Sequence, residues 1–321
     1  MARTLFVLGG NGFIGHEVVI EALTAGWQVK ALVHSAEGAL KLQQMGVQAL
    51  VGDAQQPEMW INEARNATVL IDLVQPKLPS RISRVAIRRL STVRQTFTRT
   101  ILAALHTLPL TERPLFFSVS GADDLQPDAQ QTISHSSLLR SRPQGFAHIG
   151  IPVRQVIEAS GMDATYVYLG GLVYGPGKAF VQVYVTGLAK GNALVIGRGT
   201  NRLPLVHVTD AARALVHLAG LPRINLVGKT FIAMDGADST QRQLLDDTAA
   251  FIGVKQARTA PTWLASLFAG PITVETITLD AHADSSALLA LALRSAIHRI
   301  VKVFLQRFLN WDILSEQQHK V

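Results

Sequence analysis

Three glycines near the amino terminus, Gly9, Gly12 and Gly15, have the spacing of a phosphate-binding turn. The first permits a sharp turn, the second lets the backbone approach a pyrophosphate closely, and the third lets a helix pack tightly on the preceding strand. A helix that begins here presents free N–H groups and the positive end of its dipole to phosphates. We therefore expect a dinucleotide to contact seven consecutive residues: Gly9, Gly10, Asn11, Gly12, Phe13, Ile14 and Gly15.

A second strand is predicted at residues 27–33, and the residues at its end distinguish a site for NADP(H) from a site for NAD(H). In a dinucleotide fold this strand end meets the adenosine ribose, where an acidic side chain would bind the 2′-hydroxyl and a cation would pair with a 2′-phosphate. Neither Asp nor Glu ends the strand, whereas His34, Ser35 and nearby Lys41 can accommodate a phosphate. The sequence thus favours NADP(H) over NAD(H), and an ordinary surface histidine is the alternative interpretation of His34.

Two further strand ends carry candidate cofactor contacts. Asp53 and Ala54 follow a short strand at 47–51, and Val74 ends an apolar, β-branched strand at 68–74. Asp53 could accept a hydrogen bond from the exocyclic amine of adenine, or it could belong to an ordinary turn that caps a helix. Both interpretations stay open at this stage.

The elements that would position these residues alternate along the first half of the chain. Apolar runs that predict buried strands lie at 5–8, 27–33, 47–51, 68–74 and 115–119, and runs that predict helices lie at 16–25, 36–45 and 80–105. This alternation predicts an α/β fold with a parallel, doubly wound sheet, which binds ligands at the carboxyl ends of its strands. The polar segment 123–144 predicts a surface loop over those ends, which could act as a lid.

The run from Val7 to Gly15 resembles the nucleotide fingerprint of extended or atypical short-chain dehydrogenase/reductases, the family that includes nucleotide-sugar epimerases and dehydratases. Further landmarks are similar in the same order: Gly52-Asp53, Ser118-Val119-Ser120, Val173-Tyr174-Gly175-Pro176-Gly177 and Val206 to Ala214. The resemblance implies a Rossmann domain over 1–168 and a smaller, mainly substrate-covering C-terminal region over 169–321, with about 203–235 returning to the Rossmann sheet.

The chemistry that this resemblance implies is only partly present. These enzymes place a serine after the fifth strand and a Tyr-x-x-x-Lys pair on the next helix, where the tyrosine exchanges a proton with the substrate and the lysine lowers the pKa of the tyrosine. Ser120 resembles the serine, but the tyrosine and lysine positions fall on Phe146 and Gly150. Any proton donor of this protein is therefore expected to be nonstandard.

Two nearby residues are candidates for that donor. His148 lies two residues after Phe146 and has a pKa range suited to proton transfer near neutrality, although a plain helix histidine is the alternative. Tyr168 ends the alternating strand 165–168, where Tyr166 and Tyr168 are expected to face opposite sides. The candidate catalytic residues are thus Ser120, Tyr168 and His148.

Composition limits the other classes of function. The 321 residues contain no cysteine, and no histidine spacing indicates a metal site, so we expect neither disulfides nor a metal. The net charge of +7 is uneven, because seven Lys and Arg residues and no acidic residue lie between 77 and 99. Since the stretch offers no aromatic stacking platform, we expect a solvated helix face or a homodimer contact there rather than a nucleic-acid site.

The expected function follows from the nucleotide loop and the altered dyad. We expect a cytoplasmic, NADP(H)-binding oxidoreductase-type enzyme that acts on a small or medium-sized carbonyl or hydroxyl substrate. The alternative is a redox-silent dinucleotide-binding structural or sensor protein, or a redox-neutral isomerase or cyclase that uses the retained pocket. A basic, amphipathic pattern at 285–314 predicts helices that pack on the protein itself, with binding to a membrane surface as the other interpretation.

Overall fold

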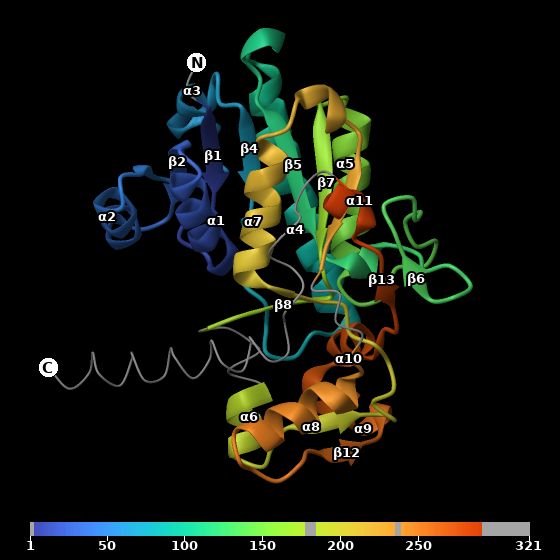
Figure 1. The fold of residues 1–321 in the computed structure, drawn as a ribbon. Helices are drawn as coiled ribbons and strands as arrows, with labels where there is room; N and C mark the ends of the chain where they lie inside the picture. The colour runs from blue at the N-terminus through green and yellow to red at the C-terminus, as the bar shows by residue number, and fades with distance from the viewer. Residues whose placement is uncertain (1–2, 177–183, 235–238, 291–321) are drawn as a thin grey trace, which may run out of the picture.

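A seven-stranded, fully parallel sheet forms the centre of the protein (Figure 1). The computed structural model describes residues 3–176, 184–234 and 239–290. The strand order is β11-β7-β5-β4-β1-β2-β3. The bounds of these strands are β1 Thr4–Leu8, β2 Gln28–Val33, β3 Gln48–Val51, β4 Val69–Asp72, β5 Leu115–Ser120, β7 Ala164–Leu169 and β11 Thr230–Ala233. The predicted doubly wound α/β fold is confirmed.

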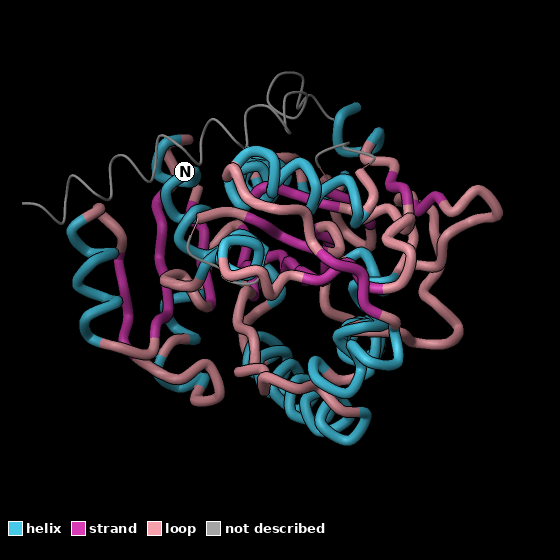
Figure 2. The backbone as a smooth tube through the Cα atoms, turned by 90° about the horizontal axis from the view of Figure 1, so that it is seen from below, coloured by secondary structure: helices cyan, strands magenta, loops and turns pink. Residues whose placement is uncertain are grey.

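Helices cover both faces of this sheet (Figures 1 and 2). Alternate side chains of β1 enter different cores: Leu5 and Val7 pack with residues of helices α1 and α7, while Phe6 and Leu8 pack with residues of helix α4. This alternation follows from the two-residue period of a strand, and burial on both faces explains why the sequence of β1 is apolar from Leu5 to Leu8. The helices of the two layers are α1 Phe13–Thr24, α2 Ala36–Gln44, α3 Ile61–Ala64, α4 Arg84–His106, α5 Ala147–Ser160 and α7 Val208–Ala219.

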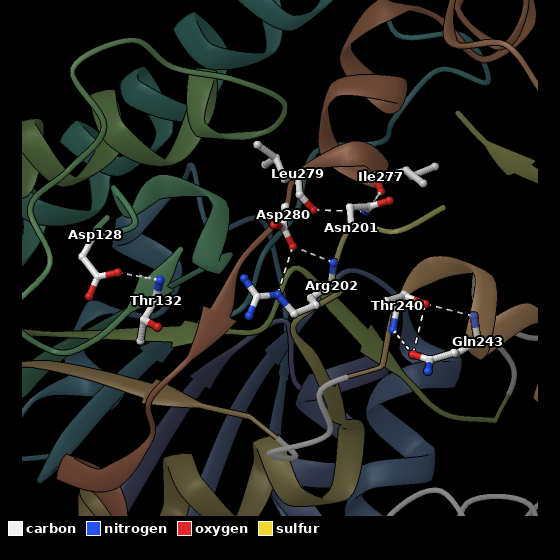
Figure 3. Close-up of polar contacts among 9 residues, drawn as sticks. All are labelled: Asp128, Thr132, Asn201, Arg202, Thr240, Gln243, Ile277, Leu279 and Asp280. Carbon is white, nitrogen blue, oxygen red and sulfur yellow. Dashed lines mark hydrogen bonds and ion pairs between the residues drawn. The ribbon is translucent and has the colours of Figure 1, made fainter. Parts of the chain in front are cut away.

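A smaller lobe follows β7 and has its own core, in which Leu188, Val195 and Leu245 are buried (Figure 1, lower part). Its helix α8 begins with a capping box: Thr240 Oγ1 accepts from the N–H of Gln243, and the Gln243 side chain accepts from the N–H of Thr240 (Figure 3). The elements of the lobe are α6 Thr186–Ala189, β9 Leu194–Ile196, α8 Gln241–Phe251, β12 Arg258–Ala260, α9 Thr262–Ala269 and α10 Pro271–Thr278.

Short parallel strand pairs connect the lobe to the main sheet. Strand β8 pairs with β10, and β6 pairs with β13. Their bounds are β6 Thr132–Ile133, β8 Leu172–Tyr174, β10 Leu205–His207 and β13 His282–Ala283. The last described helix, α11, spans Ser286–Ala290, so the remainder of the predicted 285–314 helical pattern lies outside the described residues. No helix within the described part of the chain has both the length and the apolarity needed to cross a bilayer.

The basic stretch of α4 makes intramolecular ion pairs. Arg84 Nη2 lies 2.6 Å from Glu275 Oε1 on α10, and Arg94 Nη2 lies 2.6 Å from Asp72 Oδ2 at the end of β4. The helix begins at Ser83, whose hydroxyl accepts from the N–H of Ala86 at 3.1 Å. Part of the predicted basic face therefore serves to attach α4 to the sheet and the smaller lobe.

Candidate active site

The glycine loop between β1 and α1 is too tight for side chains at Gly9, Gly10 and Gly15. Gly9 has a φ of +83°, and its N–H donates to the Leu32 carbonyl at 3.1 Å, which joins the loop to the end of β2. A Cβ on Gly15 would overlap the carbonyl oxygen of Gly9. The turn is thus closed by direct backbone contact between the loop and the first turn of α1, as the glycine spacing predicts.

The amino end of α1 offers uncapped N–H groups. Its N-cap residue, Gly12, is exposed and supplies no side-chain hydrogen bond to the helix. Free N–H groups and the positive end of the dipole of a 12-residue helix therefore lie at the mouth of the loop. A side chain at Gly12 would cover this end of the helix, so the bare backbone fits the pyrophosphate of a dinucleotide.

The predicted adenosine end lies at the carboxyl ends of β2 and β3. His34 is exposed there, whereas the Ser35 hydroxyl already accepts from the Gly38 N–H at 3.1 Å, and Lys41 pairs with Glu37 at 2.7 Å. All three residues predicted to accommodate a 2′-phosphate are exposed at this strand end, and the Ser35 hydroxyl keeps its own proton to donate.

The other predicted cofactor contacts follow the carboxyl ends of β3 and β4. Asp53 Oδ1 accepts from the Gln55 N–H at 2.9 Å. Asp53 therefore belongs to a local turn, the second of the two interpretations that its sequence allows. Ala54 is buried, and its carbonyl accepts from the Trp60 indole at 3.3 Å. Val74 follows β4, and its backbone lies against Gly9.

A cavity of about 280 Å³ opens at the carboxyl ends of β5 and β7. Ile14 from the glycine loop contributes to its wall, and helix α5 contributes Ile149, Gly150 and Arg154. Parallel α/β sheets bind their ligands at this edge. We call it the reaction cavity, since it also contains the predicted Ser120 and Tyr168.

Ser120 and Asp124 form a hydrogen-bonded pair in the wall of the reaction cavity. The Ser120 hydroxyl donates to Asp124 Oδ2 at 2.6 Å. Asp124 is 1% exposed, and its Oδ1 has no hydrogen-bond partner among the described residues. A Cβ on Gly150 would overlap both carboxylate oxygens of Asp124, so the missing side chain at this position makes room for the carboxyl group.

The surroundings of this pair favour a protonated carboxyl group. Burial, and then the neighbouring Asp123, raise the pKa of Asp124 well above its usual range. Burial also raises the pKa of Asp123 to about 6, against the hydrogen bond that its Oδ2 accepts from the Phe146 N–H at 3.0 Å. Two adjacent buried carboxyl groups cannot both ionise at low cost, so the pair retains a proton at higher pH than ordinary aspartates do.

Tyr168 lines the reaction cavity, but its hydroxyl is already engaged. It accepts a hydrogen bond from Arg154 Nη1 at 2.8 Å, and burial raises its pKa. The expectation that Tyr166 and Tyr168 face opposite sides is wrong, because residues two apart on a strand share a face. Both rings lie in one core beside Arg154, whose guanidinium stacks over Tyr166 at 4.1 Å.

The structure places His148 away from the reaction cavity. The charged groups that act on it are Glu275, Arg84 and Arg88, and burial lowers its pKa. Its Nε2 is buried without a hydrogen-bond partner within the described residues. His148 therefore lies between α5 and the α4–α10 side of the molecule, where it does not face a ligand at the strand ends.

The sequence contains the Tyr-x-x-x-Lys spacing at one place, Tyr174 and Lys178. Tyr174 ends β8, not a helix, and its ring lies edge-on to His207 at 5.2 Å between centroids. Lys178 lies outside the described residues. This pair consequently does not stand in the helical position that the dyad occupies in the resembling family.

Asp124 and Arg94 are among the residues of the reaction cavity that were not predicted as site residues from the sequence. Arg94 is 8% exposed, and its Nη1 has no hydrogen-bond partner in the described ranges, although Nη2 pairs with Asp72. The prediction of a surface loop over 123–144 is wrong at its start, because Asp123 and Asp124 are buried. The serine and aspartate four residues apart were a signal, but a weak one in so polar a segment.

Comparison with known proteins gives one family match. The model of the NAD(P)H-binding family matches residues 9–195 of the chain. An uncharacterized protein of Schizosaccharomyces pombe is 29% identical over 217 residues, which cover 66% of this chain and 69% of that protein. The photosystem II assembly factor Ycf39 of Trieres chinensis is 36% identical over 69 residues, so this match spans only 22% of either chain.

Solved structures share the fold at low sequence identity. The human epimerase family protein SDR39U1, solved with NADPH, has a TM-score of 0.74 at 16% identity, with 92% of this chain and 96% of that chain covered. A nucleoside-diphosphate-sugar epimerase from Pseudomonas aeruginosa has a TM-score of 0.78 at 14% identity, covering 97% of each chain. A dTDP-glucose 4,6-dehydratase from Streptomyces venezuelae, solved with NAD, has a TM-score of 0.76 at 18% identity, covering 96% of each.

Proposed function

Because the chain belongs to the NAD(P)H-binding family and has the fold of the epimerase/dehydratase branch of short-chain dehydrogenase/reductases, we propose that it is an NADP(H)-dependent oxidoreductase. Its substrate is a small or medium-sized carbonyl compound or the corresponding alcohol. The observation that carries this proposal is the Ser120–Asp124 pair at 2.6 Å, which lies in a cavity at the strand ends that also reaches the glycine loop.

The chain's own residues handle the proton in this proposal. A bound nicotinamide supplies or accepts the hydride at the substrate carbon. During reduction, protonated Asp124 donates to Ser120 Oγ, which is the reverse of the hydrogen bond that the serine donates to the ionised carboxylate. The Ser120 hydroxyl then gives its own proton to the carbonyl oxygen and takes the proton of Asp124 in exchange. Asp124 is left as a carboxylate, whose negative charge the positive charges of Arg154 and Arg140 stabilise, and it regains a proton from solvent. Oxidation of the alcohol runs the same steps in reverse.

The proposal is tested by consumption of NADPH with a panel of aldehydes and ketones. We expect one NADPH to be oxidised for each alcohol formed, with deuterium from deuterated NADPH found on the carbinol carbon. Binding of NADPH without turnover of any carbonyl compound would favour the redox-silent alternative, which the loss of the dyad at Phe146 and Gly150 supports. Substrate conversion with no net change in NADPH would favour an isomerase or cyclase.

A preference for NADPH over NADH is a separate prediction. It rests on the exposed His34 at the end of β2, where no acidic side chain competes with a 2′-phosphate. We expect NADPH to bind about tenfold more tightly than NADH, which corresponds to about 1.4 kcal/mol. Replacing His34 with Glu should reverse the order, because the carboxylate accepts from the ribose 2′-hydroxyl and repels the phosphate. Equal affinities in a fluorescence titration of the wild-type protein would contradict this assignment.

We also propose a cellular location and an oligomeric state for the protein. A cytoplasmic location is supported by the absence of cysteine from the sequence. A homodimer is supported by the basic, partly apolar outer face of α4, on which Val85 and Val93 are exposed. Light scattering at several protein concentrations would distinguish a dimer from a monomer.

A further inference from the structure

A second cavity lies beside the reaction cavity, and its wall is largely apolar. It measures about 250 Å³ and lies between the loops that follow β5 and β7 and the helix α10. We call it the apolar chamber. Its apolar lining includes Leu172, Leu203, Pro204, Ile277, Leu279 and Ala281.

The apolar chamber adjoins the reaction cavity. Asp123, Phe146 and Gly171 line both spaces. Phe146 presents an apolar ring at this boundary, in the position where the resembling family has a tyrosine. We propose that the apolar chamber holds the body of an apolar carbonyl substrate, an aliphatic or aromatic aldehyde or ketone, while the carbonyl group enters the reaction cavity beside Ser120. This inference rests on the proposed function and specifies its substrate class.

The charges of the apolar chamber argue against a nucleoside diphosphate sugar. Among its described lining residues, Asp123 and Arg140 are the charged ones. Arg140 is already engaged, since its Nε donates to the Asp123 carbonyl at 2.8 Å. A diphosphate is bound by several cations or free N–H groups, and a single half-buried arginine next to two acids does not supply them. An uncharged ligand needs no cations or free N–H groups, so it suits this lining.

The far wall of the apolar chamber is held in place by polar contacts outside it. Asn201 Nδ2 donates to the carbonyls of Ile277 at 2.8 Å and Leu279 at 3.2 Å (Figure 3). The N–H of Arg202 donates to Asp280 Oδ1 at 2.8 Å in the same place. These bonds fix the backbone on which two lining side chains stand, so the apolar chamber is formed before a ligand binds, as small-molecule sites usually are.

Binding of prodan, a neutral naphthyl ketone whose emission shifts to the blue in apolar surroundings, tests this inference. We expect saturable binding with a blue shift by the wild-type protein. Leu279→Asn should weaken binding at least about tenfold, because it places an unpaired amide in the apolar wall. Leu267→Asn is the matched control, since Leu267 is 58% exposed on α9 and should leave both prodan and NADPH affinity unchanged.

Competition in the wild-type protein gives a second readout that needs no variant. We expect octanone to displace prodan and UDP-glucose not to displace it. Absence of prodan binding, or displacement by UDP-glucose, would overturn the inference. If prodan and octanone bind but no carbonyl compound is reduced, the apolar chamber stands and the proposed function fails. If NADPH is oxidised only with nucleotide sugars, the function stands and the apolar chamber is misassigned.

Discussion

Replacing Asp124 with asparagine is expected to slow carbonyl reduction by about 10² to 10⁴-fold and to leave NADPH affinity unchanged. Asparagine has the same shape and still accepts the hydrogen bond that Ser120 donates at 2.6 Å, but it cannot release a proton. The rate is measured from NADPH oxidation with the best carbonyl compound of the panel. Asp128→Asn is the control, because Asp128 is exposed in the same segment and accepts from the backbone N–H groups of Gln130 and Thr132, the second of which Figure 3 shows.

The pH dependence of the reduction rate distinguishes a loss of proton supply in the Asp124→Asn variant from a general disturbance of the site. Burial and Asp123 raise the pKa of Asp124, so the protein holds the proton below that raised pKa and loses it above. Reduction requires the protonated form, and the wild-type rate should therefore fall as pH increases through this pKa. The Asp124→Asn variant should lack that decline. A variant with wild-type rate and the same pH profile would remove Asp124 from the account.

Replacing Gly12 with alanine is expected to weaken NADPH binding by at least about a hundredfold. The methyl group would stand at the uncapped amino end of α1, where the phosphates approach, and losing charged hydrogen bonds there costs about 3 kcal/mol. The fold should persist, since the closest contact of the new Cβ would be the Gly9 oxygen at 3.1 Å. Affinity is measured by isothermal titration calorimetry.

Gly220 offers a matched control for this substitution. It ends α7 beside Arg3, at the opposite end of the sheet from the glycine loop, and a Cβ there would also meet a neighbour at 3.1 Å, the end of the Arg3 side chain. Gly220→Ala should bind NADPH like the wild type. Equal, undiminished affinity in both variants would mean that the dinucleotide does not bind at this loop.

The fold could be predicted because its signals are local. The central strands β1 and β4 are buried on both faces, so their sequences are almost wholly apolar. The glycine triplet indicates where the first helix begins. The expectation about Tyr166 and Tyr168 fails because the two-residue period of a strand places both on one face. These local patterns predict that the site lies at the carboxyl ends of the strands, and therefore at one edge of the sheet.

The proton-handling pair could not be predicted because it depends on tertiary contacts. Asp124 follows Ser120 in a segment rich in polar residues, which alone indicates a solvated loop. In the structure, the Ala122 N–H donates to the Gly170 carbonyl at 2.7 Å and draws this segment under the sheet edge. The absent side chain at Gly150 then provides the space for the carboxyl group. Neither contact can be recognised from a periodic pattern of residues in the sequence.

The burial of Arg94 could not be predicted from the sequence either, because it also depends on tertiary contacts. The run of basic residues on α4 predicts exposure for all of them, yet Arg94 points inward to Asp72, which is 2% exposed. An i, i+4 pattern cannot tell one buried arginine from its exposed neighbours, because the difference lies in which side of the helix meets the sheet. Its Nη1 has no hydrogen-bond partner among the described residues, and the side chain lines the reaction cavity, where the basic run predicts a surface position.

A titration of the wild-type protein with NADPH, followed by nicotinamide fluorescence, tests the central claim most directly. The glycine loop and the reaction cavity together predict saturable binding with micromolar affinity, and an emission that increases and shifts to the blue as the nicotinamide leaves water. The Gly12→Ala variant should show neither change at the same concentrations. Emission from the wild-type protein that equals that of free NADPH up to millimolar cofactor would contradict the account.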